Sequence, residues 1–500
     1  MLIAVAFVLM GVMFLAGMYV AGALGSLALI LLNLFSDNPV WNIMGNRAWE
    51  TNTNVNLVAI PLFILMGEIV LRGGFADLMY RALSRWVDFI PGGLMHTNIA
   101  SCAVFAACAG SSIATAATVS RVALPSFRAQ GYQERLVVGS LAAGGTLGIL
   151  IPPSILLVLY GLTVGESIGR LFLAGFIPGI LLALVFMLMI GVASVIWPAI
   201  APRQQQGRFW TWEGWTERLL FTVLMVPVMA LIFIVLGSIY FGWATPSEAA
   251  GFGVAGAMVL AIIYNFVRLF AGDIAGLLLR SGIADRMSPE VRATLAGWRE
   301  QYRFDGESLR NYCRFMGTMT LEACGSAARS SAMILFILMA AFTLQFAFAY
   351  LRISITMAEW VASFNLTTVQ LVLFLVVFYL LLGTFMEAYS MMLTTLPIIS
   401  PVLRAAEVDL LWFGIIMIIL LEAAQISPPQ GLSLYVLQGA RHDVARQEAD
   451  ATGQVARTGT INDVYIGVLP FMACMAVVIG LIIAFPDLAL WLPDQIKGPR

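Results

Sequence analysis

Two apolar stretches of this chain are each interrupted by two adjacent prolines, Pro152-Pro153 in the first and Pro428-Pro429 in the second. Proline removes a backbone donor and clashes with the preceding helical turn, so each pair must break its helix. Because lipid cannot satisfy the backbone groups that a break frees, we expect both breaks to line a site enclosed by protein. Broken helices at matching places in two halves of a chain are typical of the substrate and ion site of a secondary transporter.

Composition places the chain in a membrane. Of its 500 residues, 60% are hydrophobic and 11% are charged, whereas charged residues make up about a quarter of a typical soluble domain. A formal net charge of −1, without a basic or aromatic cluster, argues against a nucleic acid partner. Apolar stretches lie near residues 2–35, 56–71, 93–124, 136–163, 168–197, 219–237, 245–270, 331–350, 367–400, 412–438 and 464–485.

Two of these stretches, 93–124 and 367–400, exceed the roughly 20 residues of one membrane crossing. Each carries small or polar residues near its middle, Gly110-Ser111-Ser112 in the first and Gly383-Thr384-Phe385-Met386-Glu387 in the second. A re-entrant helical hairpin, which enters the membrane, turns near its middle and leaves by the same side, explains both. The sequence therefore predicts two re-entrant hairpins, each followed by a broken helix.

Arginine placement orients these segments. Arginines flank the first hairpin and recur around residues 198–218, 268–329 and 441–457. The positive-inside rule assigns these segments to the cytoplasm. The segment after the second hairpin has Arg404 beside acidic residues, a balance more typical of the outside. We therefore expect the first hairpin to open inward and the second outward.

The spacing of the two hairpins and breaks predicts an inverted repeat. The separation of Gly110 from Pro152 nearly equals that of Glu387 from Pro428. If each half crosses the membrane five times, which requires two crossings within residues 2–35, the second half is inverted and both termini lie outside. We therefore expect an all-α polytopic membrane protein of the elevator-type class, with its site at the repeat interface.

The same pattern predicts the domain boundaries. The first repeat is expected at 1–200, and the second at 201–270 and 331–500. Between them, 271–330 is polar and mixed in charge, and we expect a cytoplasmic insertion or linker there. The hairpins and broken helices within the repeats are expected at 93–124, 136–163, 367–400 and 412–438.

Oxygen-bearing residues lie at both hairpin tips and both breaks. Hard cations such as Na⁺ are bound by hydroxyl and carbonyl oxygens, and the C-terminal ends of half-helices add partial negative charge. We expect one Na⁺ site in each half, where the hairpin tip meets the break. The candidates are Ser111, Ser112, Gly144, Gly145 and Thr146 in the first half, and Gly383, Thr384, Glu387, Gln425, Ile426 and Ser427 in the second. The alternative is that these residues only allow helices to pack closely.

Carboxylates within a membrane helix cost roughly 2.5–3.5 kcal/mol and usually have a function. Glu387 is therefore a candidate functional residue, with a hydrogen bond between helices as the alternative. For Glu422, both interpretations stay open. Glu68 precedes Arg72 by one helical turn, and we expect an ion pair between them.

The half-helices that start after the two proline pairs present unpaired backbone amides, which attract anions. A substrate that bears a carboxylate, bound between the two hairpin tips, is therefore expected. The candidate substrate contacts are Gly110, Ser111, Pro153, Thr384 and Pro429.

Several ordered motifs carry a resemblance to a known family. They are AIPLFILMG at 59–67, IPGG at 90–93, FAACAGSSIATAAT at 105–118, Leu124-Pro125, Gly131-Tyr132, GGTLGILIPPS at 144–154, LFLAG at 171–175, Pro178-Gly179 and ISPP at 426–429. Together they resemble the large permease subunit of TRAP (tripartite ATP-independent periplasmic) transporters, the DctM-like family. The resemblance covers nearly the whole chain except 271–330.

This resemblance implies a multi-pass protein of a bacterial or archaeal inner membrane that imports an organic acid by Na⁺ symport and an elevator mechanism. In such a membrane, the termini that the five-crossing count places outside would be periplasmic. It implies two partners, a small four-helix membrane subunit and a periplasmic binding protein that delivers the substrate. Because no additional set of spans flanks the crossings, we expect the small subunit to be a separate protein.

The resemblance also places the Na⁺ ligands. Carried over residue by residue, they fall at Ser111-Ser112 with the break from Gly145 to Pro152. The second set falls at Gly383 to Glu387 with the break from Gln425 to Pro428. The family often has Asp where this chain has Glu387, so the longer side chain is a departure from its pattern.

Two other functions are alternatives. An intramembrane serine protease with Ser111 as nucleophile would need a general base, and the two histidines are His96 and His442. A helical arm would separate His96 from the tip by about 22 Å at 1.5 Å per residue. An ion channel is disfavoured because no ring of charges accompanies the hairpins. We therefore expect a transporter and not an enzyme.

Overall fold

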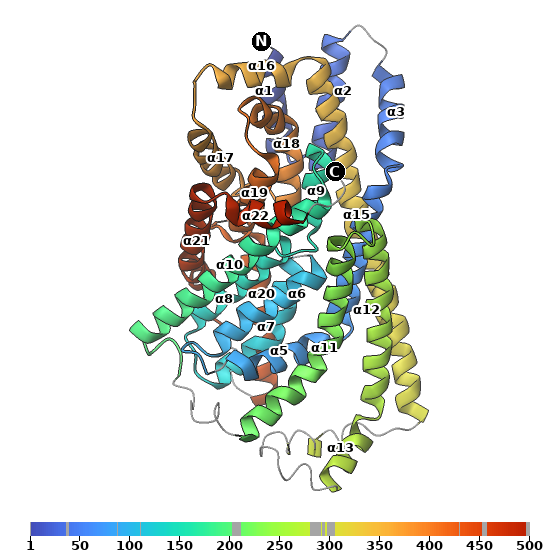
Figure 1. Ribbon diagram of the computed structural model, residues 1–500, viewed down its shortest axis with the longest axis vertical. Helices are drawn as coiled ribbons and strands as arrows, with labels where there is room; N and C mark the ends of the chain where they lie inside the picture. Colours follow the sequence, from blue (N-terminus) through green and yellow to red (C-terminus); the bar gives the residue numbers. More distant parts are fainter. Residues whose placement is uncertain are drawn as a thin grey trace.

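The computed structural model describes residues 2–36, 40–87, 89–110, 112–202, 212–280, 292, 296–297, 306–429, 431–452 and 458–496. Within these residues every regular element is a helix (Figure 1). Five helical segments are long and apolar enough to cross a membrane, namely Val55–Arg72, Ile168–Ile196, Pro246–Leu269, Glu307–Tyr350 and Ile461–Ala484. The prediction of an all-α chain with several apolar helices is confirmed.

The first half of the chain begins with two separate helices where the sequence has one apolar stretch, 2–35. A turn around Gly17, which has a φ of +73°, separates them. The helices of this half are α1 (Leu2–Leu15), α2 (Val20–Phe35), α3 (Val40–Asn52), η1 (Val55–Val58), α4 (Ala59–Arg72), α5 (Phe75–Val87), α6 (Leu94–Ala109), α7 (Ser112–Ala129), α8 (Glu134–Thr146), η2 (Leu147–Ile149), α9 (Ile155–Val164) and α10 (Ile168–Ile196).

The second half has longer helices at its start. Its elements are α11 (Trp212–Tyr240), α12 (Pro246–Leu269), α13 (Ala271–Arg280), α15 (Gly306–Tyr350), α16 (Ile353–Ala362), α17 (Thr368–Leu382), α18 (Ala388–Ala405), α19 (Leu410–Ile426), α20 (Leu432–Thr452), α21 (Ile461–Ala484) and α22 (Asp487–Gln495). The short α22 follows the last long apolar helix and packs against α10.

Both predicted hairpins consist of two helices joined by a short turn. In the first, α6 and α7 pack together and Gly110 occupies the turn with a φ of +57°. In the second, the hydroxyls of Tyr379 on α17 and Thr395 on α18 are hydrogen-bonded at 2.6 Å. The predicted C-terminal ends, 124 and 400, are too early. Both α7 and α18 continue because Pro125, and Pro397 with Pro401, lie inside the helices without ending them.

Both proline pairs interrupt their helices as predicted. The first break separates α8 and η2 from α9, and the second separates α19 from α20. Both Pro–Pro peptide bonds are cis. The predicted end of the second broken helix at 438 is wrong, because α20 continues to Thr452. Arg441 and Arg446, expected in a loop, therefore lie on a helix.

The predicted cytoplasmic insertion at 271–330 stays a prediction, and within it α15 starts at Gly306 and continues as one helix to Tyr350. Residues 281–291, 293–295 and 298–305 lie outside the described part of the chain. Two polar residues in this part of α15 contact α4. Glu322 accepts from Arg72 on α4 at 2.7 Å, and Ser326 donates to Glu68 at 2.7 Å. Glu68 also pairs with Arg72 at 2.8 Å, as predicted.

The core of the fold is α19, in which every residue is buried. It packs against α8, α9 and α10 of the first half and against α17, α18, α20 and α21 of the second. The two halves are therefore interleaved around one helix. An apolar helix that is hydrophobic on all sides is expected in such a position.

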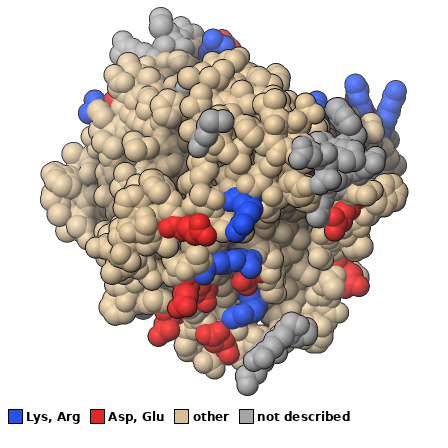
Figure 2. All heavy atoms as spheres, turned by 90° about the horizontal axis from the view of Figure 1, so that it is seen from above, with Lys and Arg blue, Asp and Glu red and all other residues tan. Residues whose placement is uncertain are grey.

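Helices α5 and α13, from segments that the sequence assigns to the cytoplasm, lie toward the same end of the molecule. In Figure 1, α5 and α13 lie in the lower part, whereas α16 and the N-terminus lie at the upper end. Figure 2 views this upper end from above and shows acidic and basic side chains interspersed near its middle, on a surface that is mostly uncharged. The orientation in the membrane stays a prediction. The inverted repeat and the membrane depth of each hairpin remain predictions.

The first broken helix is held by a direct backbone contact between α8 and α21. A Cβ atom added at Gly139 would overlap the carbonyl oxygen of Gly467, and one at Gly467 would overlap that of Arg135. Small residues allow helices in membranes to approach this closely. Beside the crossing, Arg135 pairs with Asp463 at 2.7 Å. The position of the first break therefore depends on a glycine pair.

We expect the substitution Gly467→Ala to lower the unfolding temperature of the purified protein in detergent by several degrees. The new methyl group must push α8 and α21 apart, and such overpacking costs about 1–3 kcal/mol. Gly480→Ala is the matched control, since Gly480 lies on the same helix with no heavy atom within 4 Å of an added Cβ. Equal unfolding temperatures for the two variants would contradict the close crossing.

Candidate functional site

The last turn of α19, residues 422–426, is the place where both breaks and both hairpin tips meet. From the first tip, the Ser112 hydroxyl donates a hydrogen bond to Oε1 of Gln425. From the second tip, Gly383 packs so closely on Ala424 that a Cβ at Gly383 would overlap the alanine side chain. The sequence assigned each tip to the break in its own half. The structure adds a direct link between the first tip and the second break.

The first predicted Na⁺ site brings the first tip against both sides of the first break. A Cβ at Gly145 would lie 3.1 Å from the carbonyl oxygen of Ser112, so the break and the tip touch through their backbones. A Cβ at Gly110 would lie 3.5 Å from the carbonyl oxygen of Pro153. The Thr146 hydroxyl donates to the carbonyl of Ala143 at 2.8 Å. Ser111, predicted as a ligand and a substrate contact, lies outside the described residues.

The second predicted site contains a cavity of 430 Å³ between the second tip and the second break. Glu387 on its wall is the residue immediately before α18, and Tyr435 belongs to the first turn of α20. The lining residues are Gly383, Phe385, Met386, Glu387, Ala424, Gln425 and Tyr435. Gly383, Glu387 and Gln425 were predicted from the sequence as residues of this site, and Tyr435 was not. Tyr435 follows the second proline pair by about two helical turns, a spacing that could have indicated it.

Hydroxyl groups around the second break are engaged with backbone carbonyls. Ser427 donates to the carbonyl of Ala424 at 3.1 Å, and Thr384 donates to that of Leu381 at 2.7 Å. A hydroxyl that donates its proton keeps its oxygen lone pairs for a cation. The carbonyl of Pro429 accepts from Tyr435 at 3.0 Å and from the α21 residue Tyr465 at 2.9 Å. Two tyrosines thus satisfy a carbonyl next to the break.

Glu422 is fully buried on α19. Its carboxyl lies beside the backbone of Leu150 in the first break, in an orientation that leaves neither oxygen with a well-formed hydrogen bond. Glu422 and Thr146 occupy the same position in their broken helices, counted back from the proline pair that follows each of them. Glu422 therefore belongs to the second broken helix and contacts the first break.

The two histidines lie apart from this meeting point. His96 is near the start of α6, where its Nε2 is 2.7 Å from the carbonyl oxygen of Pro91. His442 is on α20 and lies 3.0 Å from the amide nitrogen of Gln438. The imidazole of His96 thus has its partner just before the first hairpin. The imidazole of His442 has its partner on α20, the helix after the second break.

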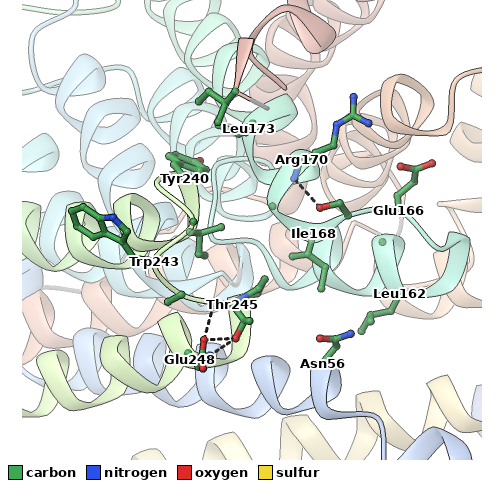
Figure 3. Close-up of a pocket in the computed structure, with 18 of the residues that line it drawn as sticks. Asn56, Leu162, Glu166, Ile168, Arg170, Leu173, Tyr240, Trp243, Thr245 and Glu248 are labelled. Atoms are coloured by element: carbon green, nitrogen blue, oxygen red, sulfur yellow. Dashed lines mark hydrogen bonds between the residues drawn. The ribbon is translucent and has the colours of Figure 1, made fainter. Parts of the chain in front are cut away.

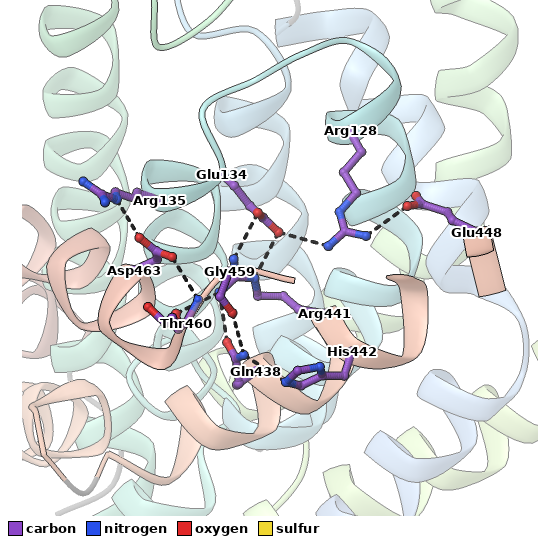
Figure 4. Close-up of polar contacts among 10 residues, drawn as sticks. All are labelled: Arg128, Glu134, Arg135, Gln438, Arg441, His442, Glu448, Gly459, Thr460 and Asp463. Carbon is purple, nitrogen blue, oxygen red and sulfur yellow. Dashed lines mark hydrogen bonds and ion pairs between the residues drawn. The ribbon is translucent and has the colours of Figure 1, made fainter. Parts of the chain in front are cut away.

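An ion-pair network joins the first hairpin and first broken helix to α20 (Figure 4). Arg441 on α20 is fully buried and pairs with Glu134 at 3.0 Å. Glu134 also pairs with Arg128 at 3.1 Å, and Arg128 pairs with Glu448 at 2.9 Å. Burial alone would raise the pKa of Glu134, but the hydrogen bonds and charges of Arg441 and Arg128 outweigh it and lower the pKa. Arg441 is thus a structural anchor between the two halves.

A larger cavity, of 660 Å³, lies away from both proline pairs (Figure 3). The α9–α10 turn lines one side of it, and η1 and the α11–α12 turn line the other. A neighbouring cavity of 470 Å³ shares Asn54 and Leu162 with it and reaches α15. The two cavities form a loosely packed seam between the α9–α10 turn and the group of η1, α12 and α15. The sequence contained no signal for this seam.

The fold has a counterpart among solved structures. The YdaH transporter of Alcanivorax borkumensis superposes with a TM-score of 0.56, covering 96% of this chain and 98% of that protein. The two sequences are 14% identical, so this likeness concerns the fold alone.

Several curated proteins are similar along the chain. The C4-dicarboxylate TRAP transporter large permease protein DctM of Vibrio cholerae is 28% identical over 500 residues, covering 100% of this chain and 99% of that protein. The sialic acid TRAP transporter large permease protein SiaM of Vibrio cholerae is 26% identical, with 98% and 97% covered. The isethionate TRAP transporter permease protein DctMQ of Oleidesulfovibrio alaskensis is 28% identical over 434 residues, covering 85% of this chain and 58% of that protein.

A family model also matches this chain. The model described as "Tripartite ATP-independent periplasmic transporter, DctM component" matches residues 7–488, nearly the full described chain. This family consists of transport proteins and not of enzymes, which agrees with the expectation from the sequence. The chain therefore belongs to the DctM family, the large permease subunits of TRAP transporters.

Proposed function

We propose that this chain is the translocating subunit of a Na⁺-coupled symporter that imports an organic acid across the inner membrane of a bacterium or archaeon. The observation that carries the proposal is the convergence of both hairpin tips and both breaks on the last turn of α19. Interrupted backbone with hydroxyl, amide and carboxyl oxygens provides the ligands that a hard cation needs. These groups lie where substrate and ions must bind together.

The first Na⁺ site is formed by Ser112 and by the backbone from Gly145 to Pro152. Because the Ser112 hydroxyl gives its proton to Gln425, both of its lone pairs are available to a cation. Ser111 completes this set as an expectation from the sequence. The second site uses Glu387, Gln425 and the backbone around Gly383 and Ser427, on the wall of the 430 Å³ cavity.

The substrate binds in the 430 Å³ cavity between the second tip and the second break. The relatives named above transport, by their names, C4-dicarboxylate, sialic acid and isethionate, which are all acids. The cavity wall contains Glu387 but no Lys, Arg or His among the described lining residues. A bound Na⁺ would supply the positive charge that brings an organic anion next to this carboxyl group.

Transport proceeds by an elevator movement in which the hairpins and broken helices move together. Two features support this proposal. The network of Arg441, Glu134 and Arg128 joins α7 and α8 to α20, so these elements can move as a unit. The seam of 660 and 470 Å³ cavities separates the α9–α10 turn from η1, α12 and α15, and weak packing there lets the two groups slide.

The working assembly includes two further proteins. The family description names a tripartite periplasmic transporter. We propose that a separate small four-helix membrane subunit binds this chain and that a periplasmic binding protein delivers the organic acid to the end shown in Figure 2.

A direct test is the thermal stability of the purified chain in Na⁺ and in choline. A ligand that binds only the folded state at one hundred times its Kd stabilises the protein by about 2.7 kcal/mol. We expect Na⁺ to raise the unfolding temperature and Ser112→Ala to reduce this shift strongly, because a ligand oxygen is lost. Ser120→Ala is the control, since Ser120 lies on the same helix and bonds its own backbone. A full Na⁺ shift in Ser112→Ala would exclude the first site.

A second test separates the two intramembrane glutamates in transport. We expect Glu387→Gln to reduce Na⁺-driven uptake at least tenfold, because the substitution removes a charged ligand from the cavity. Glu68→Gln should have a small effect, because Glu68 pairs with Arg72 on α4. The measurement is uptake of radiolabelled succinate, sialic acid and isethionate into proteoliposomes that contain the three-component system. Equally small effects of both substitutions would assign Glu387 a structural role.

A further inference from the structure

Gln425 belongs to both proposed cation sites at once. Its Oε1 accepts the hydrogen bond of Ser112, which is the first residue of α7. Its side chain also lines the 430 Å³ cavity together with Glu387. Gln425 is buried, with 5% of its surface exposed, so this arrangement is part of the protein interior.

The groups on either side of this hydrogen bond are held by tight packing. Next to Gln425, Ala424 lies so close to Gly383 that a Cβ at Gly383 would overlap the alanine side chain. Next to Ser112, the backbone is covered by Gly145, where an added Cβ would lie 2.7 Å from the Ala116 side chain. The Ser112–Gln425 bond therefore joins two close backbone contacts, one in each site.

A cation bound at the first site would strengthen this hydrogen bond. A cation on the Ser112 oxygen polarises the hydroxyl and makes it a stronger donor, since hydrogen bonds to or from charged groups are the stronger ones. The stronger bond holds the carbonyl of Gln425 in one orientation. A glutamine side chain loses considerable rotamer freedom when it is ordered. A cation that enters the second site after Gln425 is ordered no longer bears that cost.

We propose that Gln425 is a positioning residue that couples the two cation sites, so that occupation of the first site increases the affinity of the second and the reverse. The inference rests on the proposed Na⁺ coupling. Without such a link, two cations at neighbouring sites repel each other and bind independently or with negative cooperativity. Positive cooperativity therefore requires a physical connection, and the Ser112–Gln425 bond is one. Coupling is reciprocal, so it is visible at both sites.

Equilibrium binding of ²²Na⁺ to the purified full-length chain tests the proposal without substrate or partners. We expect the wild-type protein to bind two Na⁺ with a Hill coefficient clearly above one. In Gln425→Ala and in the nearly isosteric Gln425→Met, the second site keeps Glu387 and its backbone ligands. Two Na⁺ should therefore still bind at saturation, the second one more weakly. Their Hill coefficient should fall to one or below, and half-saturation should require about fivefold more Na⁺ or higher, the lower range of typical coupling.

Two further variants serve as controls. Gln425→Glu keeps an acceptor oxygen for Ser112 and should retain cooperativity. Asn265→Ala removes a buried amide that bonds the carbonyl of Gly73 at 3.0 Å, away from both sites, and should leave the isotherm unchanged. If Gln425→Ala fails to fold, as judged by thermal unfolding in choline, Gln425→Met decides the question.

The outcomes distinguish this inference from the proposed function. Wild-type cooperativity that persists in Gln425→Met overturns the coupling role. So does a variant that binds one Na⁺ per chain with unchanged affinity, because Gln425 would then be a simple ligand. A wild-type protein that binds two Na⁺ without cooperativity overturns the inference and leaves Na⁺ coupling intact. A wild-type protein that binds no Na⁺ overturns both.

Discussion

The backbone groups that the two proline pairs free must be satisfied inside the protein, and the rest of the structure is arranged around this requirement. The chain places its most completely buried helix, α19, between the two breaks. One break terminates this helix, and the other lies against it at Glu422 and Leu150. The hairpin tips then close over the same turn through Ser112 and Gly383. The outer helices hold this arrangement in place, through the glycine crossing of α8 with α21 and the ion pairs of Arg441.

The same arrangement connects structure to transport. Backbone oxygens that are not used by helical hydrogen bonds are ready-made ligands for a hard cation, and their fixed positions make binding selective. The close contacts around α19 are the basis for the proposal that occupation of one cation site affects the other. The loose seam beside the α9–α10 turn provides the opposite property, a boundary along which a rigid unit can move. A coupled transporter needs both.

Local sequence determined which parts of the fold could be predicted. The breaks and the hairpin turns were predictable because proline and glycine act on the adjacent backbone. The ends of α7, α15, α18 and α20 were not. Prolines inside α7 and α18 are tolerated, and polar residues such as Ser326 on α15 and Arg441 on α20 have partners distant in sequence. From the sequence alone, a polar side chain such as Arg441 indicates a loop, because its partner Glu134 is not apparent.

The candidate site was predictable in its composition and not in its connections. The residues with oxygen ligands at tips and breaks could be named from their positions beside the proline pairs. The link between Ser112 and Gln425 joins residues of different halves, and no pattern within either half encodes it. The same holds for the contact of Glu422 with Leu150 and for Tyr465, which reaches the second break from α21. These contacts depend on how the halves interleave.

If the proposed function is right, the last turn of α19 and the two hairpin tips enclose bound Na⁺. Cryo-electron microscopy of the full-length protein, prepared once in Na⁺ and once in choline, can detect these ions. We expect density for an ion between Ser112 and the backbone of Gly145 to Pro152, and for a second in the cavity beside Glu387 and Gln425, in Na⁺ only. Identical maps in the two salts, with neither position occupied, would contradict it.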